Sequence, residues 1–394
     1  MAKNNRWLLP EGVEEILPGQ AWQIEQFRRR VLDLYRGCGY ELVIPPLIEY
    51  SESLLIGLGS DMDLQTFKLT DQLSGRTLAI RADITPQTAR IDAHSHPQEG
   101  PARLCYAGTV VQTRPKSDLA SRIPIEVGAE LYGDDGLYSD LEVISLMLAT
   151  IAEAGIKQVH LDLGHIAIYR GLVKAAGLDE GTEQTLYDAF ERKAAGDVAA
   201  IVTEQVADQA LVDMLCALVE LHGDSDAVLT QAARQLAKAP PAVKKALADL
   251  SQLAALIRQR FPDTPLVMDL AELRGYQYHT GLVFAAYIAG VGHAVANGGR
   301  YDGIGQAFGR ARPATGFSAN VKDLLLRGWQ ENETENDQLI LAPCDDDVHL
   351  VQMIIELRSS GKRVVQALPD GAVPGDCRQQ LVKEDGQWQI RPLP

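Results

Sequence analysis

The chain has 394 residues, of which 46% are hydrophobic and 23% charged, an ordinary composition for a globular protein of two or three domains. Its net charge is −16, from 37 Lys+Arg against 53 Asp+Glu, so we expect no nucleic-acid partner, because such binders rely on basic side chains at phosphates. No run approaches the roughly 18 apolar residues of a membrane helix, and the first ten residues lack a signal-peptide core, so we expect no membrane association and a cytoplasmic location.

The cysteines and histidines give no sign of a metal site or a disulfide framework. The five cysteines lie far apart and form no Cys-x-x-Cys pair, so we expect reduced thiols. His94 and His96 are close in sequence, but no third ligand stands nearby, which is typical of surface-loop histidines. We therefore expect neither a metal nor a cofactor.

The first predicted elements are a helix followed by extended segments. Residues 21–36 place apolar side chains at helical spacing and predict a helix that ends at Gly37. Residues 40–48 are extended in character, and Pro45-Pro46 favours an edge or interface strand because proline has no backbone N–H to donate. Residues 76–83 alternate as a strand does. The apolar face of that strand would contain Leu78, Ile80 and Ala82.

A second alternating segment, residues 126–132, places two acids on one face of a strand. Glu126 and Glu130 would lie about 7 Å apart, with only the hydrogen atom of Gly128 between them. Such a pair is costly to bury without a cation, so the spacing alone favours a solvent-facing position. The opposite, apolar face would contain Val127, Ala129 and Leu131.

Other residues would complement the two acids in a ligand site. Asp83 ends the strand at 76–83 and adds a third carboxylate. Arg274 offers a planar fork that matches a carboxylate ligand. Together with Glu126 and Glu130 they would suit a zwitterion whose side chain carries protons, such as histidine.

From residue 139 onward, the sequence pattern predicts a helix, a helical insertion, a linker and a small C-terminal domain. Ser139-x-x-Glu142 predicts a capping box for a helix that ends at Gly155. Residues 175–260 are rich in alanine and leucine and lack strand patterns, which predicts a helical insertion. It would interrupt a core made of 1–174 and 261–326. The polar segment 327–337 is typical of a linker, and 338–394 predicts a small α/β domain, with strands at 338–342 and 363–366 and a helix at 348–359.

Several segments, in this order, resemble the histidyl-tRNA synthetases, members of the class II aminoacyl-tRNA synthetases. The resemblance covers residues 1–326 and rests on Pro45–Glu49 at the dimerisation motif, Thr66–Thr85, Cys105–Pro115 at motif 2, Arg274–Phe284 at the histidine motif, and Asn297–Phe317 before motif 3. By this resemblance Asp83 and Thr85 would hold an ammonium group, and Glu126 and Glu130 would face an imidazole. Arg274 and Tyr278 match the histidine motif, whereas Glu126 and His279 stand where the family has glutamine and tyrosine.

The positions that this family uses for ATP are changed. Gln112 stands where motif 2 has its arginine, Arg114 where it has glutamate, and Asp323 where motif 3 has its arginine. Losing one preorganised charge contact typically costs about 3–4 kcal/mol of transition-state stabilisation, so adenylate formation should be all but abolished. The C-terminal segment 338–394 is also too short and too acidic for an anticodon-binding domain.

This combination resembles the family of ATP phosphoribosyltransferase regulatory subunits. The resemblance implies an α+β fold with a class II synthetase-like core, an antiparallel sheet flanked by helices. It implies a self-dimer through the region around Pro45-Pro46, and a hetero-octamer with the short-form catalytic subunit. The chain would have no catalytic activity of its own; it would activate its partner in histidine biosynthesis and mediate feedback inhibition by histidine. The effector pocket would contain Asp83, Thr85, Glu126, Glu130, Arg274 and Tyr278.

Two alternatives stay open at this point. A diverged histidyl-tRNA synthetase-like enzyme would form histidyl-adenylate or charge a carrier, although Gln112 and Asp323 predict no such reaction. A stand-alone amino-acid sensor would serve some other partner.

Overall fold

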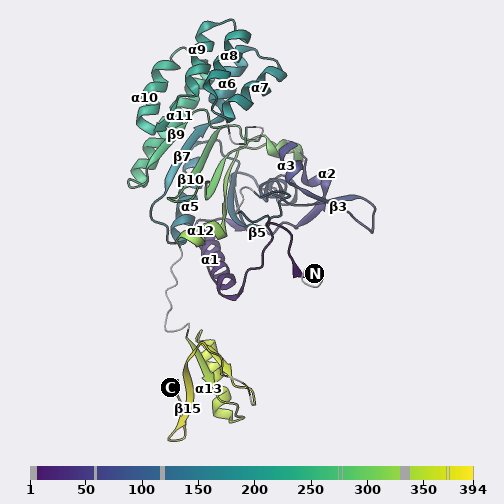
Figure 1. Ribbon diagram of the computed structural model, residues 1–394, viewed down its shortest axis with the longest axis vertical. Helices are drawn as coiled ribbons and strands as arrows, with labels where there is room; N and C mark the ends of the chain where they lie inside the picture. Colours follow the sequence, from purple (N-terminus) through teal and green to yellow (C-terminus); the bar gives the residue numbers. More distant parts are fainter. Residues whose placement is uncertain are drawn as a thin grey trace, which may run out of the picture. The chain divides into compact units, whose positions relative to one another are not determined.

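The computed structural model describes residues 7–56, 60–115, 120–273, 275–276, 278–328, 338–369, 371 and 373–393. Arg274 and most of the predicted linker at 327–337 therefore lie outside the described residues. The chain forms two compact units, Met1–Trp329 and Gln330–Pro394, which are described separately (Figure 1). Within the described ranges, no helix combines the length and the apolar character that crossing a membrane requires.

The first unit contains two sheets, each with helices packed beside it. Its strands are β1 (Glu41–Leu42), β2 (Ile48–Tyr50), β3 (Phe67–Thr70), β4 (Thr77–Ile80), β5 (Ala102–Thr109), β6 (Ile125–Tyr132), β7 (His160–His165), β8 (His222–Asp224), β9 (Leu266–Asp269), β10 (Leu282–Tyr287), β11 (Ala296–Arg300) and β12 (Ala314–Asn320). Its helices are α1 (Pro18–Gly37), α2 (Ser51–Leu54), α3 (Ser60–Gln65), α4 (Thr85–Arg90), η2 (Ile91–Ser95), α5 (Leu137–Glu153), α6 (Ile166–Ala176), α7 (Glu180–Glu191), α8 (Ala195–Gln205), α9 (Gln209–Leu218), α10 (Ser225–Gln235), α11 (Pro241–Arg260), η3 (Ile304–Phe308) and α12 (Val321–Gly328).

The large sheet has the strand order β1-β5-β6-β12-β11-β10-β7-β9-β8. Its six central strands, from β5 to β7, pair antiparallel, and parallel pairs join β1 to β5 and β7 to β9. Helices α1, α5 and α12 lie together against this sheet (Figure 1). The predicted antiparallel sheet flanked by helices is confirmed. The smaller sheet has the order β2-β4-β3.

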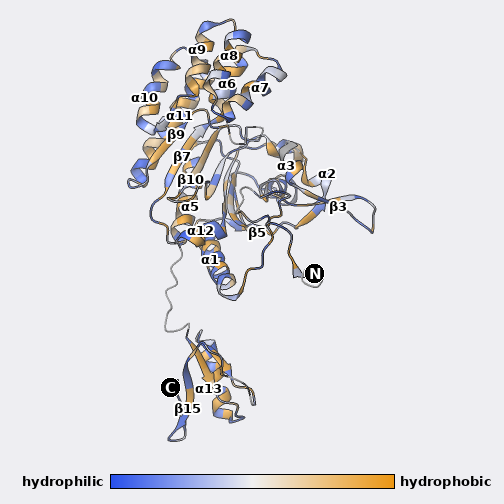
Figure 2. Cartoon of the chain, in the orientation of Figure 1, coloured by the Kyte–Doolittle hydropathy of each residue, from blue (hydrophilic) through white to orange (hydrophobic). Residues whose placement is uncertain are grey.

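The side chains of β6 alternate between the two faces of the large sheet, so that every second residue lies in the core and the others lie on the opposite face. Val127, Ala129 and Leu131 are buried in the same core as the apolar stripe of α1, as their period-2 spacing predicts. In that core the Tyr35 ring meets Phe317 of β12 edge to face, with ring centroids 6.2 Å apart. Figure 2 shows the apolar residues gathered along the central strands and on the helix faces turned toward them. The acidic residues of β6 consequently point to the opposite face.

The segment predicted to be a helical insertion contains α7 to α11, which Figure 1 shows gathered beside the β7 and β9 side of the sheet. It also contains β8, which pairs antiparallel with β9 as an edge strand. The expectation that this segment has no strand was wrong. The three residues of β8, His222-Gly223-Asp224, include no β-branched or aromatic residue, so no strand pattern was present to detect.

Three local predictions also need correction. Helix α5 begins at Leu137, so Ser139 lies inside its first turn, where its hydroxyl donates to the Gly136 carbonyl at 2.6 Å instead of capping. The carboxylate of Glu142 accepts two hydrogen bonds from Arg103, so no capping box forms.

Pro45-Pro46 lies between β1 and β2 and not within a strand, because neither residue has an N–H to donate. On β4 it is Ala79 that is buried, while Leu78 and Ile80 are half-buried.

The second unit is a small α/β domain. It contains β13 (Leu339–Ala342), α13 (Val348–Ser359), β14 (Arg363–Gln366), β15 (Cys377–Glu384) and β16 (Gln387–Pro392), with the strand order β14-β13-β15-β16. The first three elements match the predicted ones. The hairpin between β15 and β16 turns at Asp385-Gly386, both with positive φ, and this pair is a recognised hairpin signal.

Candidate functional site

A cavity of about 690 Å³ brings together most of the residues predicted to form the ligand site. Asp83, Thr85, Glu126, Glu130 and Tyr278 all line it. Arg274, the sixth predicted residue, lies outside the described residues.

Local backbone contacts position Asp83 and Thr85. Asp83 and Thr85 lie where the chain passes from β4 into α4. The backbone N–H of Thr85 donates to Asp83 Oδ1 at 2.9 Å, which fixes the carboxylate at the start of the helix. A negative charge is favourable at this end of a helix because the first N–H groups point toward it.

Glu126 and Glu130 are both buried, at 6% and 1% exposure. The solvent-facing alternative that their spacing favoured is therefore wrong. The reason lies in the sheet: β6 is a central strand, with β5 and β12 beside it, and its acidic face forms part of the cavity wall.

Two phenols hold the carboxylate of Glu130. Tyr106 OH on β5 donates to Glu130 Oε1 at 3.2 Å, and Tyr301 OH donates to Oε2. Burial raises the pKa of Glu130 to about 8, although the bond from Tyr301 opposes this shift. That pKa value includes a further upward contribution from Asp83, whose like charge disfavours the ionised form. The cavity thus contains a carboxyl group whose charge changes near pH 8.

Two glycines make this arrangement possible by leaving space. In the β5–β6 register Tyr106 stands opposite Gly128, and a Cβ at Gly128 would overlap its phenol. A Cβ at Gly316 of β12 would overlap the carboxylate of Glu130. The gap predicted between the two glutamates is therefore filled by Tyr106.

Sequence reasoning did not single out Tyr106 or Tyr301 as site residues. Both lie within segments quoted for the resemblance, Cys105–Pro115 and Asn297–Phe317. Their contact with Glu130, however, depends on which strands become neighbours. No spacing within either segment predicts that contact.

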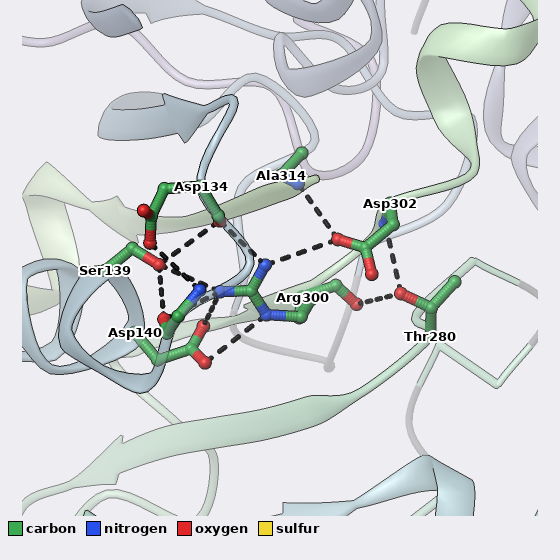
Figure 3. A network of polar contacts seen from close by, with 8 residues as sticks. Asp134, Ser139, Asp140, Thr280, Arg300, Asp302 and Ala314 are labelled. Carbon is green, nitrogen blue, oxygen red and sulfur yellow. Dashed lines mark hydrogen bonds and ion pairs between the residues drawn. The ribbon is translucent and has the colours of Figure 1, made fainter. Parts of the chain in front are cut away.

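A network of polar contacts surrounds Arg300, the residue before Tyr301 in the sequence (Figure 3). The Arg300 guanidinium donates to Asp140 Oδ1 at 2.9 Å and Oδ2 at 3.3 Å, and to the Ser139 hydroxyl at 3.0 Å. On the other side of Tyr301, Asp302 Oδ1 accepts the Ala314 N–H at 3.0 Å. The residues on both sides of Tyr301 are therefore fixed, which aims its phenol at Glu130.

Replacing Arg300 with leucine should lower the free energy of unfolding by about 3–5 kcal/mol, because Asp140 would stay buried without its partner. Urea denaturation at pH 7 measures the change. Arg192→Leu is a matched control, because its ion pair with Asp197 is exposed and should contribute less than about 1 kcal/mol. Equal losses in the two variants would contradict the assigned role of the network.

The ionisable residues in the described lining of the cavity are mainly acidic. Its acids are Asp83, Glu126, Glu130, Glu191 and Asp323, and the lining residues that the structure describes include no lysine or arginine. Gln112 and Asp323, the residues predicted to replace ATP-binding arginines, both line it. Asp323 Oδ2 lies 3.2 Å from His293 Nε2, and Gln112 Nε2 donates to the Ala82 carbonyl at 3.4 Å. Such a surface favours a cation or a zwitterion and repels phosphate.

Among the described residues, no group of three or more histidine, cysteine, aspartate or glutamate side chains is arranged to hold a metal ion. His96 instead lies 2.7 Å from the Gln98 amide nitrogen at the surface.

The sequence matches two protein families. Residues 12–324 match the family described as Histidyl-tRNA synthetase, and residues 337–391 match the ATP phosphoribosyltransferase subunit HisZ C-terminal domain. A protein of Pseudomonas fluorescens strain Pf-5 is 53% identical over 397 aligned residues, and one of Pseudomonas putida strain F1 is 52% identical. Each alignment covers 100% of both chains, and both proteins are named ATP phosphoribosyltransferase regulatory subunit.

Solved structures share the fold. A crystal structure from Bacillus halodurans, described as an ATP phosphoribosyltransferase regulatory subunit/histidyl-tRNA synthetase, is 25% identical, with a TM-score of 0.82 over 95% of this chain and 96% of that one. The histidyl-tRNA synthetase of Nostoc sp. PCC 7120 is 16% identical, with a TM-score of 0.77 over 98% and 97%. The predicted α+β fold with a class II synthetase-like core is confirmed.

Proposed function

Because the chain belongs to the family of ATP phosphoribosyltransferase regulatory subunits, we propose that it regulates a short-form catalytic subunit in the histidine pathway of the cytoplasm. It activates that subunit, performs no chemistry itself, and carries the histidine site through which the pathway end product inhibits. One observation supports this role above the others: the cavity keeps acidic residues suited to an amino acid, yet has Gln112 and Asp323 at the expected ATP positions.

Histidine would occupy the part of the acidic cavity where Asp83, Thr85 and Glu130 lie close together. Its ammonium group suits Asp83 and Thr85, and its imidazole suits Glu130, which near neutral pH holds a proton that it can donate to the ring. The Tyr278 hydroxyl is buried without a hydrogen-bond partner in the described part of the chain, so a ligand atom would satisfy it. Glu126 adds negative charge beside this position, and Arg274 would receive the ligand carboxylate.

Inhibition requires two states of the complex that bind histidine with different affinity, since a ligand that binds both equally shifts nothing. A tenfold difference corresponds to about 1.4 kcal/mol per site. This chain would stabilise the active assembly, and histidine would favour the slow one.

The assembly would be a hetero-octamer of four regulatory and four catalytic chains, built on a self-dimer around Pro45-Pro46. Support for the self-dimer comes from the apolar residues beside these prolines. Ile44 is 85% exposed, and Leu47 and Ile48 are also exposed. Exposed apolar residues gathered in this way are typical of protein–protein contacts.

The test is the rate of ATP phosphoribosyl transfer by a short-form catalytic subunit from the same source, with and without this chain, while histidine is titrated. We expect activation that histidine reverses. Sedimentation should give a dimer for this chain alone and a hetero-octamer for the mixture. No change in rate and no complex would refute the proposed partner.

A further inference from the structure

We propose that helices α6 and α7 hold Tyr276, and with it the neighbouring Tyr278 in the cavity, with Arg170 and Glu183 as positioning residues, and that histidine binding is thereby coupled to α7. The inference rests on the proposed function, since it deepens the regulation of the same cavity. These helices flank the histidine-motif segment but do not belong to it.

Tyr276 is held from both ends by polar contacts. Its hydroxyl donates to Glu183 Oε1 of α7 at 2.5 Å. Arg170 Nη2 of α6 donates to the Tyr276 carbonyl at 2.8 Å and to the His279 carbonyl at 3.3 Å, and its guanidinium lies 4.9 Å from the centre of the Tyr276 ring. Burial raises the pKa of Tyr276 to about 12, so the phenol keeps its proton at neutral pH and remains a donor.

The neighbouring Tyr278 lines the cavity. The Tyr278 and His279 N–H groups both donate to the Gly275 carbonyl at 2.8 Å, so Tyr276 lies inside the turn that sets the position of Tyr278. Tyr278 stacks on Tyr301, with ring centroids 5.1 Å apart and planes at 20°. Tyr301 in turn donates to Glu130. A continuous set of contacts therefore runs from Glu183 to the carboxyl group of the proposed effector site.

Helix α7 also borders the cavity directly. Tyr187 and Glu191 line it, and the Tyr187 hydroxyl donates to Glu191 Oε1 at 2.6 Å. The apolar side of α7, with Leu186 and Phe190 fully buried, packs through apolar and ring contacts, which the Tyr276→Phe substitution would keep. The polar contacts to Tyr276 can therefore change without removing the packing that holds the helix. This combination suits an element that responds to a ligand.

Histidine binding to the full-length chain, measured by calorimetry, tests the inference. Tyr276→Phe removes only the hydroxyl and should weaken binding about 10-fold, as expected for a hydrogen bond to a charged group. Glu183→Gln should weaken it similarly, and the double variant should bind no more weakly than either single one, because both remove the same contact. Glu180→Gln, an exposed acid in the first turn of the same helix, is the matched control and should bind as the wild type does.

Hydrogen–deuterium exchange of residues 180–191 gives a readout that a purely structural role would not move. In the wild type, histidine should slow exchange in this helix, and in Tyr276→Phe and Glu183→Gln this protection should be lost. Unchanged affinity and unchanged protection in both variants would overturn the inference and leave the proposed function standing. Absence of histidine binding by the wild type would overturn both.

Discussion

Replacing Glu130 with glutamine should stabilise the unliganded protein above pH 8 while weakening histidine binding roughly 10- to 100-fold. Burial raises the pKa of Glu130 to about 8, whereas an exposed glutamate in the unfolded chain titrates near 4.5. Between these values the unfolded chain has lost a proton that the folded protein retains. The free energy of unfolding must therefore fall as the pH rises through this window, and stay at its lower value above it.

The expected size of this effect is large. Each pKa unit corresponds to about 1.4 kcal/mol, so the wild type should lose on the order of 4 kcal/mol of stability across the window. Glutamine resembles the protonated carboxyl in shape and can still bond both phenols, but it does not titrate. The stability difference between the variant and the wild type should therefore be small at pH 5 and widen up to pH 8.

Urea denaturation from pH 5 to pH 9 measures this difference. Glu220→Gln, at an exposed position, should follow the wild-type curve throughout. Parallel curves for Glu130→Gln and the wild type would mean that the pKa of Glu130 is not raised in the folded protein.

Histidine binding should shift Glu130 from its protonated form to its ionised form. A cationic imidazolium beside it favours the ionised form, so at pH 7 the proton of Glu130 should pass to the imidazole of bound histidine, which is largely neutral in solution. Calorimetry in buffers of different ionisation enthalpy should therefore show little net exchange of protons with the buffer in the wild type, and release of a full proton would contradict this transfer.

We also expect histidine-dependent ATP–pyrophosphate exchange to be at least about 10⁴-fold slower than in a histidyl-tRNA synthetase assayed alongside. Each missing arginine contact removes about 10² to 10³ in rate, and two are replaced here. Asp323 should slow the exchange further, because its carboxylate lines the cavity and repels a triphosphate. Exchange at the rate of the synthetase would support the enzyme alternative and refute a purely regulatory role.

Restoring the positive charges provides the converse experiment. The double variant Gln112→Arg/Asp323→Arg should gain measurable affinity for ATP in equilibrium dialysis, because both positions line the same cavity. Gln231→Arg/Asp263→Arg makes the same charge change at exposed positions and is the matched control. ATP binding by the control alone, or by both variants equally, would show that net charge and not the cavity is responsible.

Sequence patterns correctly predicted the features that depend on residues close together in the sequence, such as the buried face of a strand and the extent of a helix. The alternation of residues 126–132 gave the correct buried face of β6, and helical spacing gave α1 within a few residues. The burial of Glu126 and Glu130 did not follow from their spacing, because it depends on β5 and β12 lying on either side of β6. It became an expectation only through the resemblance of other segments to a known family.

The incorrect predictions, a capping box in α5 and a segment 175–260 without strands, also arose from contacts between residues far apart in the sequence. Glu142 has the spacing of a capping box, yet Arg103 of β5 competes for its carboxylate and α5 begins earlier. Strand β8 has no pattern of its own and exists because the edge of β9 was free to pair. In both cases the deciding partner lies far away in the sequence.

The space left by Gly128 and Gly316 limits how this gene can vary. Every other amino acid adds a Cβ, so every missense change in either codon drives an atom into the Tyr106 phenol or the Glu130 carboxylate. Most positions have at least one tolerated substitute, but these two have none that leaves the polar cluster undisturbed. A lineage that keeps this cluster should therefore keep glycine at both positions.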